Sequence, residues 1–314
     1  MEKKMTALIC GSFAYDIIMT FDDQFKRHLL PDQLHKLNVS FLVSNMKKQF
    51  GGCAGNIAYN LNLLGQKCIP MGTVGQDFSD YANWMDHCGI ARDFVVQLSD
   101  TYTAQAYITT DSDGNQITMF HPGAMNFSHQ NQVNQASDVS IGIVSPDGRQ
   151  GMIDHSQQFA SSGIPFIFDP GQGMPMFGKN ELDAFIEQAT WITLNDYEFE
   201  LLQEKTGKNL SQIVDQVEAL IVTLGGEGSR IYSKSKTIEI PSVKPSQISD
   251  PTGCGDAYRA GLIFGLTHQM DWETTGRIAS LMGSIKIEHH GTQNHSYDFQ
   301  SFADRFKKQF NYSI

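Results

Sequence analysis

The sequence has few basic residues relative to its acidic ones, and this imbalance limits the partners it can bind. Its 314 residues include 34 Asp and Glu but only 23 Lys and Arg, which gives a formal net charge of −11. Binding to a nucleic-acid backbone requires a basic surface that neutralises phosphates. We therefore expect no nucleic-acid partner. A small-molecule substrate fits better, in a site where backbone dipoles and a bound cation reverse the local field.

Cysteines and long hydrophobic runs are also scarce. The five cysteines are an odd number and include no C-x-x-C pair, which argues against both a disulfide framework and a zinc knuckle. No apolar run reaches the roughly 18 residues of a membrane span, and the first residues lack the pattern of a signal peptide. The sequence thus predicts a protein of the reducing cytoplasm that does not cross a membrane.

Short apolar runs of strand length recur along the chain. They are typical of buried parallel strands and cover residues 7–10, 69–74, 139–144, 165–168, 191–194 and 220–224. The stretches between them are long enough for crossover helices, such as 57–64 before Gly65 and 197–205 before Gly207. This alternation predicts an α/β fold with a doubly wound, mostly parallel sheet flanked by helices, and with ligands at the carboxyl ends of the strands.

Two segments, 13–50 and 95–127, interrupt the alternation of strands and helices. They are rich in aromatic residues and in period-two patterns, and residues 111–115 have the composition of a hairpin turn. We expect them to form a small antiparallel β lid over the active site. An exposed apolar part of such a lid favours a homodimer joined through the lids. The α/β core would then comprise residues 1–12, 51–94 and 128–314.

Residues 250–257, with the sequence DPTGCGDA, carry the strongest chemical signal. The glycines flank a predicted helix start, where the N–H groups of Gly253, Cys254 and Gly255 can point into a concavity that holds a phosphoryl group. Asp256 lies in the first turn, where its carboxylate can accept a proton from a substrate hydroxyl. The pattern fits equally well a helix cap with Asp256 as a first-turn acid.

Two common nucleotide-binding motifs are absent. The sequence contains no G-x-x-x-x-G-K-[ST], and Tyr258 replaces the third glycine of G-x-G-x-x-G. Residues 250–256 instead resemble the second signature of the ribokinase-like (PfkB-type) carbohydrate and nucleoside kinases, D-[T/P]-T-G-[A/V/C]-G-D, at every position. Residues 51–56, GGCAGN, are similar to the first signature of that family. The resemblance implies the ribokinase-like fold and a kinase in which Asp256 is the catalytic base.

Three residues are expected to hold a sugar. The pair that includes Gly52 lets the main chain approach a flat polyol closely, and the amide of Asn56 can both donate to and accept from vicinal hydroxyls. Asp16 follows the first expected strand, where a carboxylate can accept from two adjacent hydroxyls. Taken alone, Asp16 fits a loop cap better. The resemblance makes it the residue that clamps the ribose hydroxyls.

Two further segments imply a site for ATP and Mg²⁺. Residues 195–198, NDYE, match the N-x-x-E motif of the family, in which Asn195 contributes to the ATP site and Glu198 orients a hydrated Mg²⁺. Without the family, an Asn cap followed by a first-turn acid fits this segment better. Residues 223–228, TLGGEG, resemble the loop that receives the nucleotide, although a plain hairpin turn has almost the same pattern. The contacts implied in this loop are Thr223, Gly225, Gly226 and Gly228.

Several segments resemble bacterial adenosine kinases. They are residues 30–36, 40–43, 120–125, 195–198, 256–261 and 291–293. In those enzymes an aromatic residue of the lid stacks on the purine, which places Phe120 against the base, whereas the plain alternative is that Phe120 belongs to the core of the lid. The resemblance also implies that Ser12 and Gln172 contact the nucleoside.

A monovalent cation is implied only as an optional activator. Asp250 and Thr252 correspond to ligands of the potassium site of ribokinases, so they are the candidate K⁺ ligands here. His289 and His290, however, replace smaller residues that line the cation loop in those enzymes.

The prediction from the sequence is an ATP-dependent transfer of the γ-phosphoryl group to the 5'-hydroxyl of adenosine, giving AMP in purine salvage. A sugar kinase acting on ribose or a related furanose would need the same Asp16, Asn56 and Asp256, so only the lid discriminates between the two. A catalytically silent sensor of nucleotide or nucleoside ranks last, because the motifs for catalysis are intact.

Overall fold

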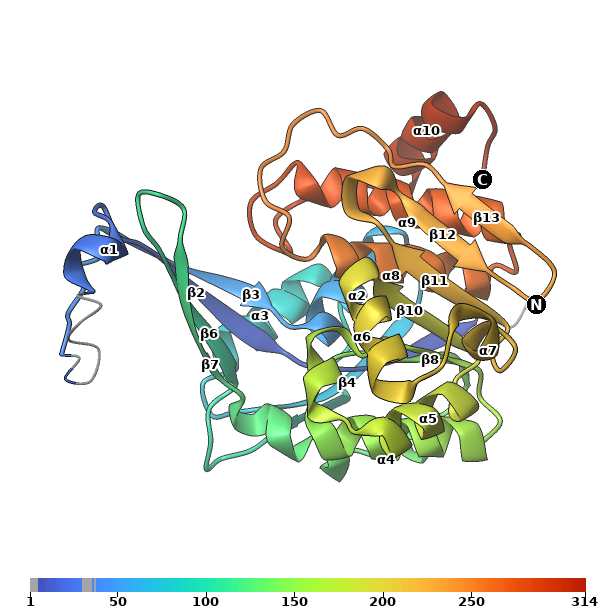
Figure 1. Cartoon of the computed structure of the whole chain (residues 1–314), viewed down its shortest axis with the longest axis horizontal. Helices are drawn as coiled ribbons and strands as arrows, with labels where there is room; N and C mark the ends of the chain where they lie inside the picture. The colour runs from blue at the N-terminus through green and yellow to red at the C-terminus, as the bar shows by residue number, and fades with distance from the viewer. Residues whose placement is uncertain (1–4, 30–35, 37) are drawn as a thin grey trace.

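The computed structural model describes residues 5–29, 36 and 38–314, and these fold around a large and a small β-sheet (Figure 1). Within the described residues the large sheet has nine strands in the order β13-β12-β11-β10-β9-β8-β1-β4-β5. Its strands are β1 (Thr6–Cys10), β4 (Cys68–Val74), β5 (Phe94–Gln97), β8 (Val139–Val144), β9 (Phe166–Phe168), β10 (Trp191–Asn195), β11 (Ala219–Thr223), β12 (Ser229–Tyr232) and β13 (Thr237–Ile240).

Seven neighbouring strands of the large sheet, β11, β10, β9, β8, β1, β4 and β5, are parallel to one another, which confirms the predicted doubly wound sheet. Strands β12 and β13 are antiparallel and close one edge of it. Strand β5 forms the other edge by pairing with β4, although the sequence assigns residues 95–127 to the lid. The second excursion of the chain into the lid therefore leaves the core after Gln97.

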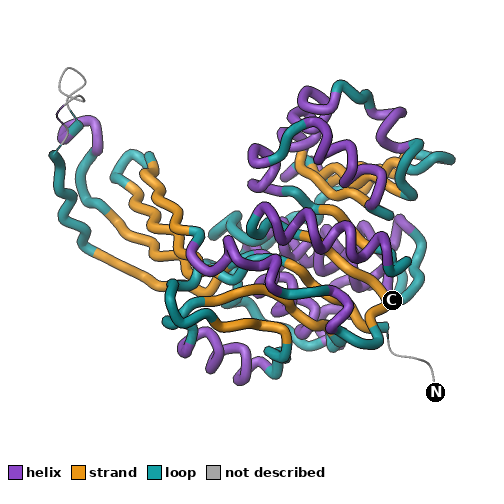
Figure 2. The backbone as a smooth tube through the Cα atoms, turned by 90° about the horizontal axis from the view of Figure 1, so that it is seen from below, coloured by secondary structure: helices purple, strands orange, loops and turns teal. Residues whose placement is uncertain are grey.

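Helices cover both faces of the large sheet (Figure 2). Alternate side chains of β1 point to opposite faces, as expected for a strand: Ala7 and Ile9 pack among α2, α3, α8, α9 and α10, while Leu8 and Cys10 pack among α4, α5, α6 and α7. The helices are α2 (Cys53–Leu63), α3 (Ser79–Cys88), α4 (Arg149–Ser161), α5 (Lys179–Gln188), α6 (Asp196–Thr206), α7 (Leu210–Val214), α8 (Cys254–Thr267), α9 (Trp272–Ile287) and α10 (Phe299–Phe310).

The small sheet is the predicted lid, and it stands out from one side of the core (Figures 1 and 2). Its strands are β2 (Ala14–Thr20), β3 (Asn45–Gly51), β6 (Ala104–Thr110) and β7 (Gln116–His121), in the order β3-β2-β6-β7. The pairs β2–β3 and β6–β7 are antiparallel, whereas β2 and β6, which come from different excursions of the chain, run parallel. Asp111 accepts hydrogen bonds from the N–H groups of Asp113 and Asn115, which confirms the predicted hairpin turn.

The register of the lid places Asp16 and Phe120, two of the predicted substrate residues, on one face. Asp16 pairs with Ala106, and Ala106 pairs with Phe120, so the three side chains form a row across the sheet. A short helix, α1 (Phe25–His28), closes the far end of the first excursion, and residues 30–35, part of the resemblance to adenosine kinases, lie outside the described residues. Among the described residues, no helix has the length and hydrophobicity needed to cross a membrane.

Candidate active site

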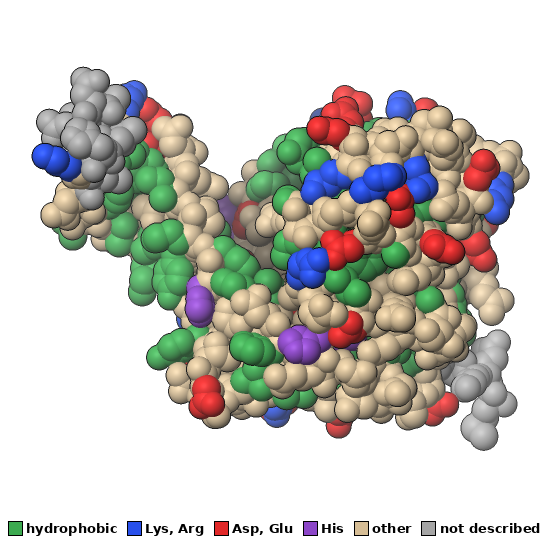
Figure 3. All heavy atoms as spheres, turned by 60° about the horizontal axis from the view of Figure 1, so that its bottom comes forward, with side chains coloured by type: hydrophobic (Ala, Val, Ile, Leu, Met, Phe, Trp, Pro, Cys, Tyr) green, Lys and Arg blue, Asp and Glu red, His purple; other side chains and the backbone are tan. Residues whose placement is uncertain are grey.

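The residues predicted from motifs gather at the carboxyl end of the large sheet. Ser12 lies two residues beyond the end of β1, Asn195 is the last residue of β10, and Thr223 is the last residue of β11. Asn195 and Thr223 are partners across the two strands. This edge is where a doubly wound sheet binds its ligands, and in Figure 3 the surface is hollowed between the lid and the core.

Helix α8 begins at this edge with the predicted anion cradle. Gly253 is its N-cap and has φ of 80°, a left-handed conformation that favours glycine, and a Cβ there would lie 3.0 Å from Thr292 Cγ2. The first N–H groups of a helix have no acceptor within the helix, so they are available to an anion. The Cys254 N–H donates instead to Pro251 O at 3.2 Å, which leaves the neighbouring amides as the donors of the cradle.

Asp256 lies in the first turn of α8 and is bound by a residue of the other signature motif. The Asn56 side-chain amide donates to Asp256 Oδ2 at 2.7 Å, although the two residues are 200 positions apart. Burial raises the pKa of Asp256 to about 6, and the hydrogen bond from Asn56 opposes that rise. A carboxyl group with a pKa close to neutrality is suited to accept a proton from an alcohol.

Asn56 is itself held by a network that the sequence analysis did not assign. It is only 3% exposed, and its Oδ1 accepts from Gln293 Nε2 at 2.9 Å. Gln293 Nε2 also donates to the hydroxyl of Tyr81 at 2.7 Å, and Gln293 Oε1 accepts from the indole N–H of Trp84 at 2.8 Å. Helix α2 begins at Cys53, four residues earlier than predicted, which brings Asn56 onto the helix face that packs against α8.

The donor and acceptor chemistry of this network fixes the orientation of Asn56. An indole N–H can only donate, so Gln293 must present its oxygen to Trp84 and its nitrogen to Asn56. Asn56 must then present its oxygen to Gln293 and its nitrogen to Asp256. The Trp84–Gln293 pair thus ensures that the carboxylate of Asp256 receives a hydrogen-bond donor.

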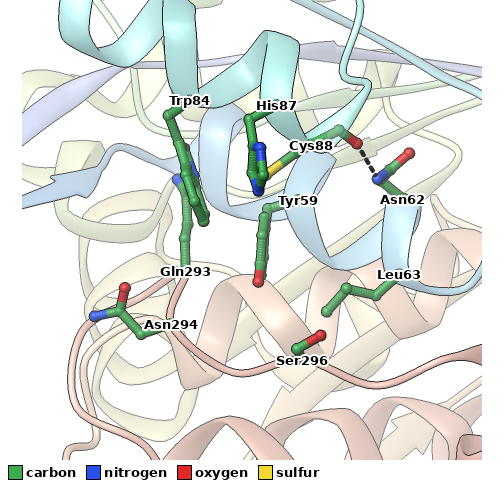
Figure 4. A pocket seen from close by; sticks show the side chains of 9 residues that line it. All are labelled: Tyr59, Asn62, Leu63, Trp84, His87, Cys88, Gln293, Asn294 and Ser296. Atoms are coloured by element: carbon green, nitrogen blue, oxygen red, sulfur yellow. Dashed lines mark hydrogen bonds between the residues drawn. The ribbon is translucent and has the colours of Figure 1, made fainter.

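The outer end of the network is open to solvent. Trp84 and Gln293 form part of the wall of a pocket of about 390 Å³, in which the rings of Trp84 and Tyr59 lie nearly parallel with centroids 6.0 Å apart (Figure 4). The remaining lining residues are Asn62, Leu63, His87, Cys88, Asn294 and Ser296.

A second group that the sequence analysis missed is a buried ion pair between α8 and the end of β9. Arg259 donates through Nε and Nη2 to the two carboxylate oxygens of Asp169, at 3.0 and 2.9 Å. Both side chains are less than one-tenth exposed. A two-point contact of this kind fixes the angle of α8, and therefore the position of Asp256, one helical turn before Arg259. Arg259 stands in the segment that resembles adenosine kinases, but its partner could not be identified from spacing.

At the base of the lid, the structure places Asp16 beside the first signature motif. Gly52 has φ of 86°, and a Cβ there would lie 2.5 Å from Ser12 O, so only glycine fits this crossing of two chain segments. Burial, followed by repulsion from Asp250, raises the pKa of Asp16 to about 6. The Ser12 hydroxyl accepts from the Cys53 N–H at 3.2 Å and thus caps α2.

On the nucleotide side, Asn195 and Glu198 form a capping box at the start of α6. Asn195 Oδ1 accepts from the Glu198 N–H at 2.7 Å, and Glu198 Oε2 accepts from the Asn195 N–H at 2.8 Å. The structure therefore contains the helix cap that the sequence offered as an alternative, and Glu198 Oε1 lies outside it. Burial and the nearby Asp169 raise the pKa of Glu198.

The loop after β11 also has the expected features. A Cβ on Gly225 or Gly226 would meet no atom within 4 Å, so the main chain is accessible there, whereas Gly228 packs against Ile240 O. Gln172, in the 3₁₀ helix that follows β9, is exposed at the same edge of the sheet.

The oxygens of Asp250, one of the two candidate potassium ligands, already accept hydrogen bonds within the protein. Asp250 Oδ1 accepts from the Thr252 N–H, and Asp250 Oδ2 accepts from the Gly291 N–H, each at 2.9 Å. The main-chain carbonyl of Asp250 accepts from Lys286 Nζ at 2.7 Å. These contacts do not fit a K⁺ ion bound by Asp250.

The chain is similar to known proteins in sequence and in structure. Residues 14–298 match the pfkB family of carbohydrate kinases. The chain is 30% identical to the nucleoside kinase of Methanothermobacter thermautotrophicus over 99% of both chains, and 25% identical to the ribokinase of Bacillus subtilis over 91% of this chain and 94% of the other. The structure of Burkholderia thailandensis nucleoside kinase in complex with inosine has a TM-score of 0.89 at 50% identity, and the match covers 98% of this chain and 99% of that chain. The structure of the same enzyme in complex with ADP-inosine has a TM-score of 0.87 at 52% identity, and the match covers 98% of this chain and 97% of that chain.

Proposed function

This chain belongs to the pfkB family of carbohydrate kinases and is therefore a phosphotransferase with an alcohol acceptor, and we propose that it phosphorylates the 5'-hydroxyl of adenosine with ATP. The coarser assignment, a ribokinase-like nucleoside or sugar kinase, follows from its relatives. The product would be AMP, which places the enzyme in purine salvage. The ADP-inosine complex of the Burkholderia enzyme supports both a nucleoside acceptor and an adenine nucleotide donor.

In the proposed reaction Asp256 accepts the proton of the 5'-hydroxyl as that oxygen attacks the γ-phosphorus. Asn56 holds one carboxylate oxygen of Asp256, which orients the base. The amides at the start of α8, from Gly253 to Asp256 apart from that of Cys254, stabilise the charge on the transferring phosphoryl group. Thr223, Gly225 and Gly226 are proposed to receive the nucleotide, together with Asn195.

The residues present fit a magnesium ion that keeps most of its water. Among the described residues no group of three or more His, Cys, Asp or Glu side chains is arranged to hold a metal, so a bare ion would lack ligands from the protein alone. Glu198 Oε1 lies outside the capping box and can accept from a coordinated water. When bound, Mg²⁺ neutralises charge on the phosphates.

The choice of a nucleoside depends on Phe120. Its ring is 53% exposed and lies in the same row of the lid as Asp16, on the face that carries the proposed sugar clamp. An aromatic side chain left exposed beside a sugar site provides a surface on which a purine can stack. Asp16, Gly52 and Asn56 are proposed to contact the ribose, and Ser12 and Gln172 to contact the nucleoside from the sheet edge.

An acceptor panel tests the proposal. Release of ADP is measured with ATP and Mg²⁺ against adenosine, inosine, guanosine and ribose. A kcat/KM for adenosine well above that for ribose would support it. Preference for inosine would keep the nucleoside kinase and correct the base, whereas preference for ribose would overturn the stacking role of Phe120. No transfer to any acceptor would contradict a kinase function.

The lid also supports a homodimer. Tyr107 and Met119 are paired across β6 and β7 on the face opposite Phe120, and they are 36% and 62% exposed. Hydrophobic side chains gather along the lid in Figure 3. An exposed apolar sheet of this kind favours pairing with a second copy. Light scattering of the purified protein tests this, and a Met119→Lys variant that remains dimeric would contradict an interface through this face.

A cytoplasmic location is proposed on the basis of the cysteines. All five are unpaired in the structure, which is typical of proteins kept in a reducing compartment.

A further inference from the structure

A lysine side chain lies entirely inside the protein beneath the anion cradle. Lys286 is in the last turn of α9 and is 0% exposed. Lysine is rarely buried without a partner, because removing its charge from water is costly. Its surroundings therefore have to replace the lost hydration.

Backbone carbonyls provide that replacement. Lys286 Nζ donates to Asp250 O at 2.7 Å and to His289 O at 3.2 Å, and it lies 4.0 Å from Asp250 Oδ2. Carbonyl oxygens converging on a centre of positive charge, with a carboxylate nearby, are the surroundings in which proteins also hold K⁺. Here the centre of charge is an ammonium group that is attached to the chain.

The ammonium joins the two loops that shape the anion cradle. Asp250 opens the segment that leads into Gly253, while His289 begins the loop that returns through Gly291 to Thr292. The two loops are also linked by the hydrogen bond from the Gly291 N–H to Asp250 Oδ2 and by the close approach of Thr292 to Gly253. A positive charge at this junction fixes the loops and adds to the potential that favours an anion at the start of α8.

We propose that the ammonium of Lys286 takes the place of a bound monovalent cation, so that the enzyme works without K⁺. The candidate site implied by Asp250 and Thr252 is then filled by the protein itself. The inference rests on the proposed function in that the cradle holds the transferring phosphoryl group. Lys286 is a positioning residue, since it acts through the loops and not by touching the substrate.

The first experiment compares the wild-type protein in chloride salts of K⁺, Na⁺, NH₄⁺ and tetramethylammonium at equal ionic strength. Turnover, KM for ATP and the thermal unfolding midpoint are measured in each. We expect all three to be the same in K⁺ and in tetramethylammonium, a cation too large to enter the site. A severalfold rise in turnover specific to K⁺ would overturn the proposal.

The second experiment removes the ammonium in two ways. Lys286→Ala leaves space for a cation, and Lys286→Met fills that space with a neutral side chain of similar length. In tetramethylammonium both variants should lose at least about tenfold in kcat/KM for ATP. K⁺ or NH₄⁺ should restore activity and raise the unfolding midpoint of Lys286→Ala but not of Lys286→Met.

Two results with the variants would contradict the proposal. One is wild-type turnover by Lys286→Ala in tetramethylammonium, and the other is a loss in Lys286→Ala that neither K⁺ nor NH₄⁺ reverses. The unfolding midpoints require no substrate, so they test Lys286 even if every acceptor fails, a result that would count against the proposed function alone.

Discussion

The two sides of the active site are built in opposite ways. Around Asp256 the polar side chains are buried and hydrogen-bonded to one another, with Asn56 only 3% and Gln293 only 2% exposed. On the lid, Phe120 is 53% exposed. Buried, fully bonded groups are held in one geometry, whereas an exposed ring can adapt to its ligand. We therefore expect the core side to set the chemistry and the lid side to set the choice of acceptor, so that changes to the two sides have different kinetic signatures.

The largest effect is expected on the core side from Asp256→Asn. Loss of the proposed base should lower kcat by about 10²–10⁴-fold. Because burial raises the pKa of Asp256, its charge is disfavoured in the folded protein, and the neutral amide should leave the unfolding midpoint unchanged or higher. Steady-state kinetics and thermal unfolding together test this. Turnover within tenfold of the wild type would remove Asp256 from the role of base.

The next effect tests the orientation of Asn56 from a distance. Gln293→Glu keeps the size of the side chain and its acceptor for Trp84, but it can no longer donate to Asn56. Asn56 can then turn its oxygen toward Asp256, which should lower kcat by about tenfold or more and raise the pKa on the acid side of the kcat profile. Trp84→Phe, which keeps a ring but removes the N–H, should shift the profile in the same direction by less. An unchanged profile in both variants would show that the network has no influence on the base.

On the lid side, Phe120→Ala should act on binding of the acceptor. Loss of a stacking contact should raise KM for adenosine by about tenfold to hundredfold, with kcat and the use of ribose nearly unchanged. Phe127→Ala is the matched control, because Phe127 is also an exposed phenylalanine but lies beyond the lid strands. An equal loss for adenosine and ribose would argue against stacking.

The smallest effect separates two carboxyl groups that both have a pKa of about 6, Asp256 in the core and Asp16 in the lid. Both must be ionised to act, so on acidification below about pH 6 kcat should fall through Asp256 and KM for the nucleoside should rise through Asp16. In Asp16→Asn the dependence of KM on pH should disappear while that of kcat remains. If acidification lowers kcat of the wild type but leaves its KM for the nucleoside unchanged, Asp16 does not bind the acceptor as a carboxylate.

The raised pKa of Asp16 also predicts that replacing this residue by a neutral one stabilises the fold. The pKa of Asp16 is higher in the folded protein than its ordinary value of 3.8, so the ionised side chain destabilises the fold at neutral pH. Asp16→Asn should therefore raise the unfolding midpoint at neutral pH. The gain should shrink as the pH falls from about 6 toward 4, because over this range the wild-type carboxyl becomes protonated in the folded state.

The sequence predicted those parts of the fold that are encoded by residues close together along the chain. Buried parallel strands such as β1 and β10 are apolar throughout and could be recognised as runs. Strands β5 and β13 form the edges of the sheet and β12 is the neighbour of β13. All three have exposed positions in their patterns, so they had no such signal. In helix α10 the aromatic residues stand at helical spacing, and Phe302 and Phe306 are buried while Phe299 is 41% exposed.

The site shows the same division. Asp256, Asn56 and Gly253 lie in motifs that can be recognised from the order of their residues, and the structure brings the three residues together as expected. The partners that hold them depend on tertiary contacts between distant segments, such as Gln293 with Asn56, 237 positions apart, and Arg259 with Asp169, 90 positions apart. No periodicity or local spacing encodes such pairs, so Gln293, Trp84, Asp169 and Lys286 could be assigned only from the folded chain.

The hydrogen bonds from Gln293 to Asn56 and from Asn56 to Asp256 also bear on when the enzyme becomes active during its synthesis. The first signature motif leaves the ribosome early. Asp256, which accepts a hydrogen bond from Asn56, follows 200 residues later, and Gln293, which donates to Asn56, comes 37 residues after that. Contacts of such long separation form late, because the intervening chain has to be ordered first. A nascent chain can therefore complete both sheets before Asn56, Asp256 and Gln293 come together.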